Sequence, residues 1–164
     1  MESGGADRGF FEIEEAAGDA WKQPNVGRGL AVADYDRDGA PDILITRNVG
    51  PPLLLRNNGG NRKSWLAVWL QGTKSNRDAI GARLSLRAAG ERQLRQVGAG
   101  SSYLSQDDRV QLFGLGAQEK AEELEVWWPS GRRQRFTNLA ARRMIRIVEG
   151  SSPQTVTPGK VAKR

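Results

Sequence analysis

The sequence predicts an all-β fold in which a strand–loop–strand unit packs on a seven-stranded antiparallel β-sandwich or barrel. Two observations lead to this prediction. Short apolar runs rich in β-branched residues flank an Asp-rich loop at residues 34–42. From residue 65 onward, about seven further short runs follow at close spacing, which is typical of a sandwich or barrel. With 164 residues and 38% hydrophobic content, the chain is able to bury a core.

The Asp-rich loop reads DYDRDGAPD, so carboxylates stand at alternate positions and a glycine follows the third of them. Oxygen ligands in this spacing suit Ca²⁺, and a flexible carboxylate cage suits Mg²⁺ less well. A solvated Asp turn explains only one or two of the carboxylates. We therefore predict a calcium site whose ligands are Asp34, Asp36, Asp38, the Ala40 carbonyl and Asp42.

The residues beside this loop argue against a helix–loop–helix calcium site. Such a site needs a bidentate Glu at position 12, which here is Ile45. Residues 30–33 and 43–46 instead predict strands, residues 53–55 predict a third short strand, and residues 57–61 predict a break. The loop is thus expected to join two strands.

The second part of the chain alternates apolar and polar residues, as half-buried strands do. Residues 65–70 are apolar on both faces, and we expect the extra face to contact the Asp-rich loop. Residues 129–131 predict a hairpin turn. The seven expected strands cover residues 65–70, 82–88, 92–97, 110–115, 124–128, 133–136 and 144–148.

The charge is unevenly distributed. Residues 1–45 carry 10 acidic and 4 basic side chains (net −6), and residues 46–164 carry 9 and 21 (net +12), which together give +6. The basic part leaves polyanion or nucleic-acid binding open as an alternative, although arginines at alternating strand positions are also typical of solvated sheet faces.

Catalysis has few candidate residues. The chain contains no cysteine and no histidine, which excludes disulfides, thiolate chemistry and Ser-His-Asp triads. A carboxylate-based glycosidase remains as a third hypothesis, but Asp107 and Asp108 are adjacent and point to opposite sides of an extended chain. We expect a non-enzymatic protein in which these two residues begin a turn.

Aromatic and basic residues also suggest a binding surface. We take Tyr103, Trp127, Arg132 and Arg133 as possible surface-binding residues, because aromatic side chains stack on sugars or bases. Residues 98–103 could present amides and hydroxyls to an anion or sugar, but they more simply form a turn between two strands.

Two known families resemble the chain. The run GRGLAVADYDRDGAPDILITRN resembles an FG-GAP/VCBS repeat, the calcium-binding blade of some β-propellers. The runs TKSNRDAIGAR, GSSYLSQ, FGLG and WPSGR, in that order, resemble the ASPIC and UnbV domain of the cartilage acidic protein family. Ala40 and Ala79 stand where relatives often carry Asp and Gly.

This resemblance implies four segments. Residues 1–25 are expected to be the tail of a preceding repeat, 26–61 a calcium-loop repeat or partial propeller blade, 62–149 the ASPIC/UnbV sandwich, and 150–164 a disordered tail. It also implies a secreted, periplasmic or cell-surface calcium-dependent adhesion module, whose partners are a protein or glycan ligand and other propeller blades of a longer chain. No signal peptide or membrane span is apparent, and nucleic acid is the less favoured partner.

Overall fold

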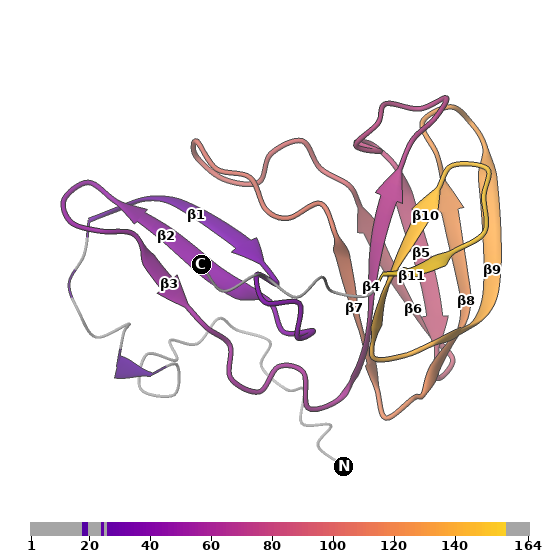
Figure 1. The fold of residues 1–164 in the computed structure, drawn as a ribbon, viewed down its shortest axis with the longest axis horizontal. Helices are drawn as coiled ribbons and strands as arrows, with labels where there is room; N and C mark the ends of the chain where they lie inside the picture. The colour runs from indigo at the N-terminus through magenta and orange to yellow at the C-terminus, as the bar shows by residue number, and fades with distance from the viewer. Residues whose placement is uncertain (1–17, 20–23, 25, 157–164) are drawn as a thin grey trace, which may run out of the picture.

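The computed structural model describes residues 18–19, 24 and 26–156, and this part of the chain is all-β, as predicted (Figure 1). Its strands form three sheets. The first is antiparallel, in the order β1 (Gly27–Ala33), β2 (Asp42–Arg47) and β3 (Leu53–Leu55). Within the described residues, no helix has the length and apolar character that crossing a membrane requires.

The other two sheets have four strands each and face one another around a shared core (Figure 1). One has the order β11-β10-β4-β7 and the other the order β6-β5-β8-β9. Their bounds are β4 (Ser64–Gln71), β5 (Arg83–Ala88), β6 (Glu91–Gln96), β7 (Gln111–Gly116), β8 (Lys120–Trp127), β9 (Arg133–Ala140), β10 (Arg143–Val148) and β11 (Gln154–Val156).

Strand alternation places the core as the sequence predicts. Leu84 and Leu86 of β5 and Leu124 and Val126 of β8 are fully buried, and they pack in one cluster with Phe113 of β7 in the opposite sheet. Each of the seven predicted strands coincides with a strand to within a few residues. The predicted hairpin at residues 129–131 is confirmed, since β8 and β9 pair antiparallel on either side of it. The fold is therefore sandwich-like.

Two expectations about this sandwich are wrong. It is not wholly antiparallel, because β10 pairs parallel with β4, Ile145 lying opposite Val68. The two residues between β9 and β10 carry the chain from one sheet to the other, so β10 does not turn back beside β9. Part of the expected disordered tail is ordered, because residues 154–156 form β11 against β10, so the described sandwich has eight strands and not the expected seven.

The expected N-terminal repeat tail lies outside the described residues, except for positions 18, 19 and 24. Residues 157–164 also lie outside them.

The three-stranded sheet contacts the sandwich through the loop between β6 and β7, which extends toward β1 (Figure 1). The Val32 amide of β1 donates to Asp107 Oδ1 at 2.8 Å, and the Val32 carbonyl accepts from the Asp108 amide at 2.9 Å. Asp108 also forms an ion pair with Arg37 at 2.9 Å. Both adjacent carboxylates thus hold the first sheet against the sandwich.

A second anchor lies directly after β10, at the carboxylate of Glu149, a residue that is 4% exposed. The amides of Thr73, Lys74 and Ser75 donate to its Oε2 at 2.8–2.9 Å. The hydroxyls of Ser75 and Ser130 donate to Oε1. One side chain after β10 therefore fixes the loop after β4 and the β8–β9 turn.

These donors determine the ionisation of Glu149. Burial alone raises its pKa, but the Ser130 hydroxyl and the amides of Ser75, Thr73 and Lys74 together outweigh burial and lower the pKa to about 2. Because the folded pKa lies below the ordinary value of 4.5, the ionised carboxylate stabilises the fold. This contribution is complete above pH 4.5 and is lost as the pH falls through about 2.

Glu149→Gln is expected to lower the free energy of unfolding at pH 7 by about 2 to 3 kcal/mol, because it removes hydrogen bonds to a charged group. The difference from wild type should shrink as the pH falls from 4.5 to about 2. Urea unfolding across this pH range measures it. Glu119→Gln, at an exposed position, is the control and should show a small, constant difference. A difference for Glu149→Gln that persists at pH 2 would contradict the assignment.

Candidate functional site

The loop at residues 34–42, hereafter the Asp loop, joins β1 to β2 and folds around its own first carboxylate. The amides of Asp38 and Gly39 donate to the two oxygens of Asp34 at 3.0 and 2.9 Å. Arg37 and Gly39 have positive φ values of 60° and 94°, which turn the chain back sharply. The loop therefore reverses direction over few residues and brings its two ends together.

Asp42 closes the Asp loop from the other side. It is 3% exposed, and its carboxylate accepts the Tyr35 amide at 3.2 Å and the Asn57 amide at 2.8 Å. Asn57 follows β3, so this single side chain ties the start of the Asp loop to the chain that leaves the three-stranded sheet. Each oxygen keeps a free lone pair for a further partner.

Three of the predicted ligands converge. One carboxylate oxygen from each of Asp34, Asp36 and Asp42 lies within 4.8 Å of the others. Ligands of Ca²⁺ lie about 2.3 to 2.6 Å from the ion, so oxygens on opposite sides are about 4.6 to 5.2 Å apart. The spacing and the oxygen-only donors fit a hard cation of this size.

The other two predicted ligands are placed differently. The Asp38 carboxylate is not part of that group, since it accepts the Ala40 amide at 2.9 Å and lies 3.5 Å from Arg56. Ala40 is fully buried, and its backbone carbonyl stays a prediction. Asn61 donates from its side chain to the Asp38 carbonyl at 3.2 Å, which joins the Asp loop to the link before β4.

The charges of the cluster are only partly balanced. Burial raises the pKa of Asp34 above its ordinary value, the amides of Gly39 and Asp38 oppose this, and the carboxylates of Asp38 and Asp36 raise it further. Arg56 lies 2.8 Å from Asp36, whose negative charge raises the pKa of Arg56. Among the described residues, one exposed guanidinium thus pairs with one of the three clustered carboxylates.

The Asp loop packs against Trp65 of β4. A Cβ built on Gly39 would lie 2.0 Å from Cε2 of the Trp65 ring, so only glycine fits there. This contact bears out the expectation that the outer face of 65–70 meets the Asp loop, but only in part, because Trp69 on the same face is 40% exposed. Trp69 instead lies beneath the guanidinium of Arg146, at 5.1 Å.

The possible surface-binding residues separate into two places. Trp127, Arg132 and Arg133 line one hollow of about 430 Å³ on the sandwich, and Tyr103 is not among its lining residues. Tyr103 is 69% exposed on the β6–β7 loop, where its carbonyl accepts from the Ser105 hydroxyl. Gly98, Gly100 and Ser101 of that loop line a different cleft of about 370 Å³ beside β1.

The hollow lined by Trp127 is also lined by Arg83, which the sequence analysis does not include among the binding residues. Strand alternation does predict that Arg83 points outward. Its position directly opposite Trp127 follows only from the β5–β8 register, which the sequence does not reveal.

Comparison with known proteins gives two results. A model of the family described as ASPIC and UnbV matches residues 72–154, just over half of the 164 residues. Cartilage acidic protein 1 of Xenopus tropicalis is 37% identical over 127 residues, covering 74% of this chain and 19% of that protein. The proteins of the same name from Mus musculus and Homo sapiens are 34% and 35% identical, covering 87% and 84% of this chain and 22% and 21% of their own lengths.

The chain therefore spans about a fifth of the length of these relatives. The similarity extends beyond the family model. An alignment covering 87% of 164 residues leaves out about 21, so a continuous one includes residues 34–42. The Asp loop thus lies within the region that is similar to the mouse protein.

Gly39→Ala is expected to destabilise the protein far more than Gly50→Ala. The two glycines have nearly equal φ values of 94° and 95°, so both changes carry the same backbone strain, about 1 to 2 kcal/mol. At Gly50 the new methyl group meets nothing closer than 3.7 Å, whereas at Gly39 it overlaps the Trp65 ring and adds about 1 to 3 kcal/mol. Thermal unfolding of both variants measures the difference. Equal losses would show that the Asp loop does not pack on Trp65.

Proposed function

The chain belongs to the ASPIC and UnbV family, and from this premise we propose that it is a non-enzymatic, extracytoplasmic binding or adhesion module whose Asp loop holds a structural calcium ion. The observation that carries the proposal is the convergence of Asp34, Asp36 and Asp42, with one oxygen from each within 4.8 Å of the others. Relatives that are named for an acidic protein of cartilage support an extracytoplasmic role.

A bound calcium ion would supply the positive charge that the three clustered carboxylates lack. Asp34, Asp36 and Asp42 would hold the ion, with Asp38 and the Ala40 carbonyl as further predicted ligands. The protein's own contacts then make the site structural: Asp42 binds the amide after β3, and Gly39 packs on Trp65. A rigid Asp loop would therefore fix the three-stranded sheet on the sandwich.

We further propose that β1–β3 are part of an FG-GAP/VCBS blade, whose neighbours are other blades of a longer chain. Both faces of this sheet carry partly exposed leucines, Leu30 on one face and Leu44 and Leu54 on the other, at 37%, 40% and 48% exposure. A propeller blade is covered on both faces by its neighbours, which agrees with this distribution. The activity and partners of the longer relatives remain proposals for this chain.

Asp36→Asn is expected to abolish stabilisation by calcium. Its carboxylate contacts Arg56 and no backbone amide among the described residues, so the change removes a ligand and leaves the loop hydrogen bonds intact. Wild type at about 100 times Kd should gain about 2.7 kcal/mol, or roughly 5 to 10 °C in Tm. Thermal unfolding in chelator, then with Ca²⁺ or Mg²⁺ added back, measures the gain.

Asp78→Asn is the matched control, because Asp78 also pairs with an arginine, Arg109, at 2.6 Å, but lies outside the cluster. It should keep the full calcium effect. An equal calcium effect in both variants, or none in wild type, would contradict a calcium site in the Asp loop.

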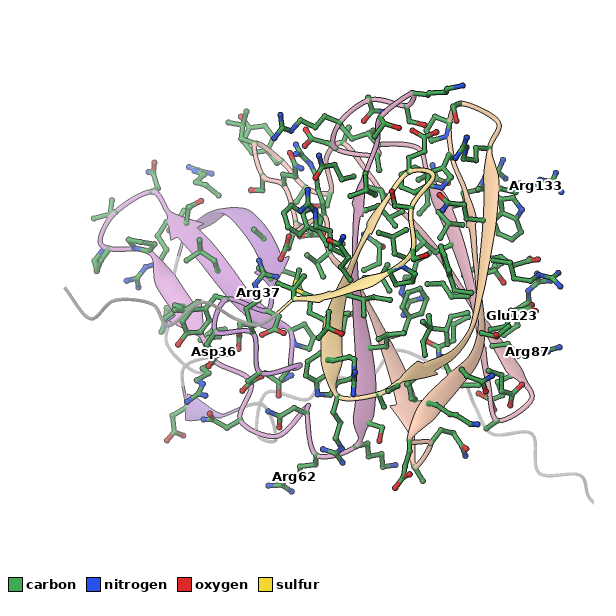
Figure 2. All side chains as sticks on the ribbon, turned by 45° about the vertical axis from the view of Figure 1, so that its right-hand side comes forward. Asp36, Arg37, Arg62, Arg87, Glu123 and Arg133 are labelled. Atoms are coloured by element: carbon green, nitrogen blue, oxygen red, sulfur yellow. The ribbon has the colours of Figure 1, made fainter. Side chains whose placement is uncertain are left out.

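Arg56→Gln is expected to tighten calcium binding by about three- to tenfold. The guanidinium lies 2.8 Å from Asp36 and competes with the ion for the same negative charge, an effect that solvent screening keeps moderate. Arg62→Gln removes a charge nearby without touching the cluster and should leave the Kd unchanged; Figure 2 shows Arg62 below the Asp36 region. Calorimetric titration with Ca²⁺ compares the two variants, and weaker binding in Arg56→Gln would count against the proposed site.

A further inference from the structure

An exposed row of residues crosses the outer face of the β6-β5-β8-β9 sheet. Trp127 of β8 lies directly opposite Arg83 of β5 on one side and Arg133 of β9 on the other. Neighbouring strands are about 4.8 Å apart, so the two arginine positions flank the partly exposed indole across about 10 Å. Figure 2 shows Arg133 at the edge of the molecule away from Asp36.

The arginines of this row differ from the others on the same face. Arg92 and Arg135 form ion pairs with Glu125, at 3.4 and 2.7 Å, and Arg87 pairs with Glu122 at 3.2 Å. Within the described residues, Arg83 and Arg133 form no contact ion pair. The adjacent Arg132 forms none either. Among the described residues, the arginines of the row thus lack the contact ion pairs that Arg87, Arg92 and Arg135 form beside it.

Two hollows meet at this row. One, of about 430 Å³, is lined by Arg83, Trp127, Trp128, Gly131, Arg132 and Arg133. The other, of about 510 Å³, shares Arg83 and Trp127 and extends over β6 to Arg95 and Leu94, which is 63% exposed. The indole and one guanidinium thus form the wall between two sites that are each large enough for a small ligand unit.

We propose that this surface, formed by Arg83, Trp127, Arg132 and Arg133, binds an oligosaccharide that carries sulfate or carboxylate groups. A sugar ring stacks on the indole face, and the guanidiniums on either side bind its anionic substituents, for which their planar fork is suited. The inference rests on the proposed role as a binding module but not on calcium, because the Asp loop contacts the opposite sheet through Trp65.

The surroundings favour a short anionic sugar over nucleic acid. Single-stranded nucleic acids stack successive bases on several aromatic side chains and follow a long basic groove. Here one partly exposed indole, that of Trp127, lies between Arg83 and Arg133. The next rows of the sheet carry Glu123 and Glu125, which limit the length of the basic track. The patch matches a few anionic sugar units.

The test uses the full chain with a heparin-derived hexasaccharide, the same hexasaccharide after desulfation, and a single-stranded DNA hexanucleotide. Calorimetry gives each Kd, and the indole N–H signals of the five tryptophans in an NMR spectrum report whether one tryptophan is contacted. Arg133→Gln and Trp127→Leu should each weaken binding of the sulfated sugar about tenfold. Arg135→Gln is the matched control, on the same strand and face but ion-paired, and should change the Kd less than about threefold.

Equal weakening by Arg133→Gln and Arg135→Gln would overturn the proposal, since it would reveal a non-specific charge effect. Tighter binding of DNA than of the sulfated sugar would also overturn it, in favour of a nucleic-acid surface. Unchanged Tm values exclude misfolding of the variants. Comparing this titration with the calcium-dependent gain in Tm separates the two proposals. Sugar binding without a gain in Tm on adding Ca²⁺ removes the calcium site and leaves this surface, and a gain in Tm without sugar binding removes this surface alone.

Discussion

The contacts between the three-stranded sheet and the sandwich determine where the Asp loop lies. The strands of this sheet have 7, 6 and 3 residues, so the sheet buries little surface of its own and gains stability from packing on a neighbour. The β6–β7 loop satisfies both backbone groups of Val32 on the edge strand β1. Trp65 provides a flat surface for the Asp loop at Gly39. The position of the three carboxylates is therefore determined by the sandwich as much as by the loop sequence.

Two buried carboxylates show how the protein stabilises negative charge, and a third group shows where this is incomplete. Asp42 and Glu149, at 3% and 4% exposure, each receive backbone amides from segments distant in the chain, which offsets the loss of water. Asp34 also accepts two amides, yet burial and its neighbours still raise its pKa. The remaining compensation near Asp36 comes from Arg56, a long and exposed side chain. A site whose remaining positive charge sits on an exposed side chain is suited to the proposed exchange of that charge for a cation.

The sequence predicted the strands well because burial on one face produces an alternation that is read directly from the residues. It did not predict their partners. Ile145 and Ile147 look the same in a strand that turns back beside β9 and in one that crosses to pair parallel with β4, so the direction of β10 was missed. Residues 154–156 are too short and polar to signal a strand, and β11 forms only because β10 offers it an edge. The carboxylate cluster of the Asp loop was predictable because its members are close in sequence. Of the residues around Trp127, the sequence predicted Arg132 and Arg133 but not Arg83, whose place opposite Trp127 follows only from the β5–β8 register.

The charge asymmetry of the chain has a spatial counterpart in the described residues. Asp36 lies toward the three-stranded sheet, and Arg133 lies at the far edge of the sandwich (Figure 2). Electrostatic fields decay within about 8 to 10 Å at physiological salt, so each surface acts on its own surroundings and the two do not cancel. An anion approaching the Asp loop meets carboxylates, whereas one approaching Trp127 meets guanidiniums that form no contact ion pair with any described acidic side chain. The proposed cation site and the proposed anion-binding surface therefore lie on different sheets, so that neither charge would weaken the binding proposed for the other.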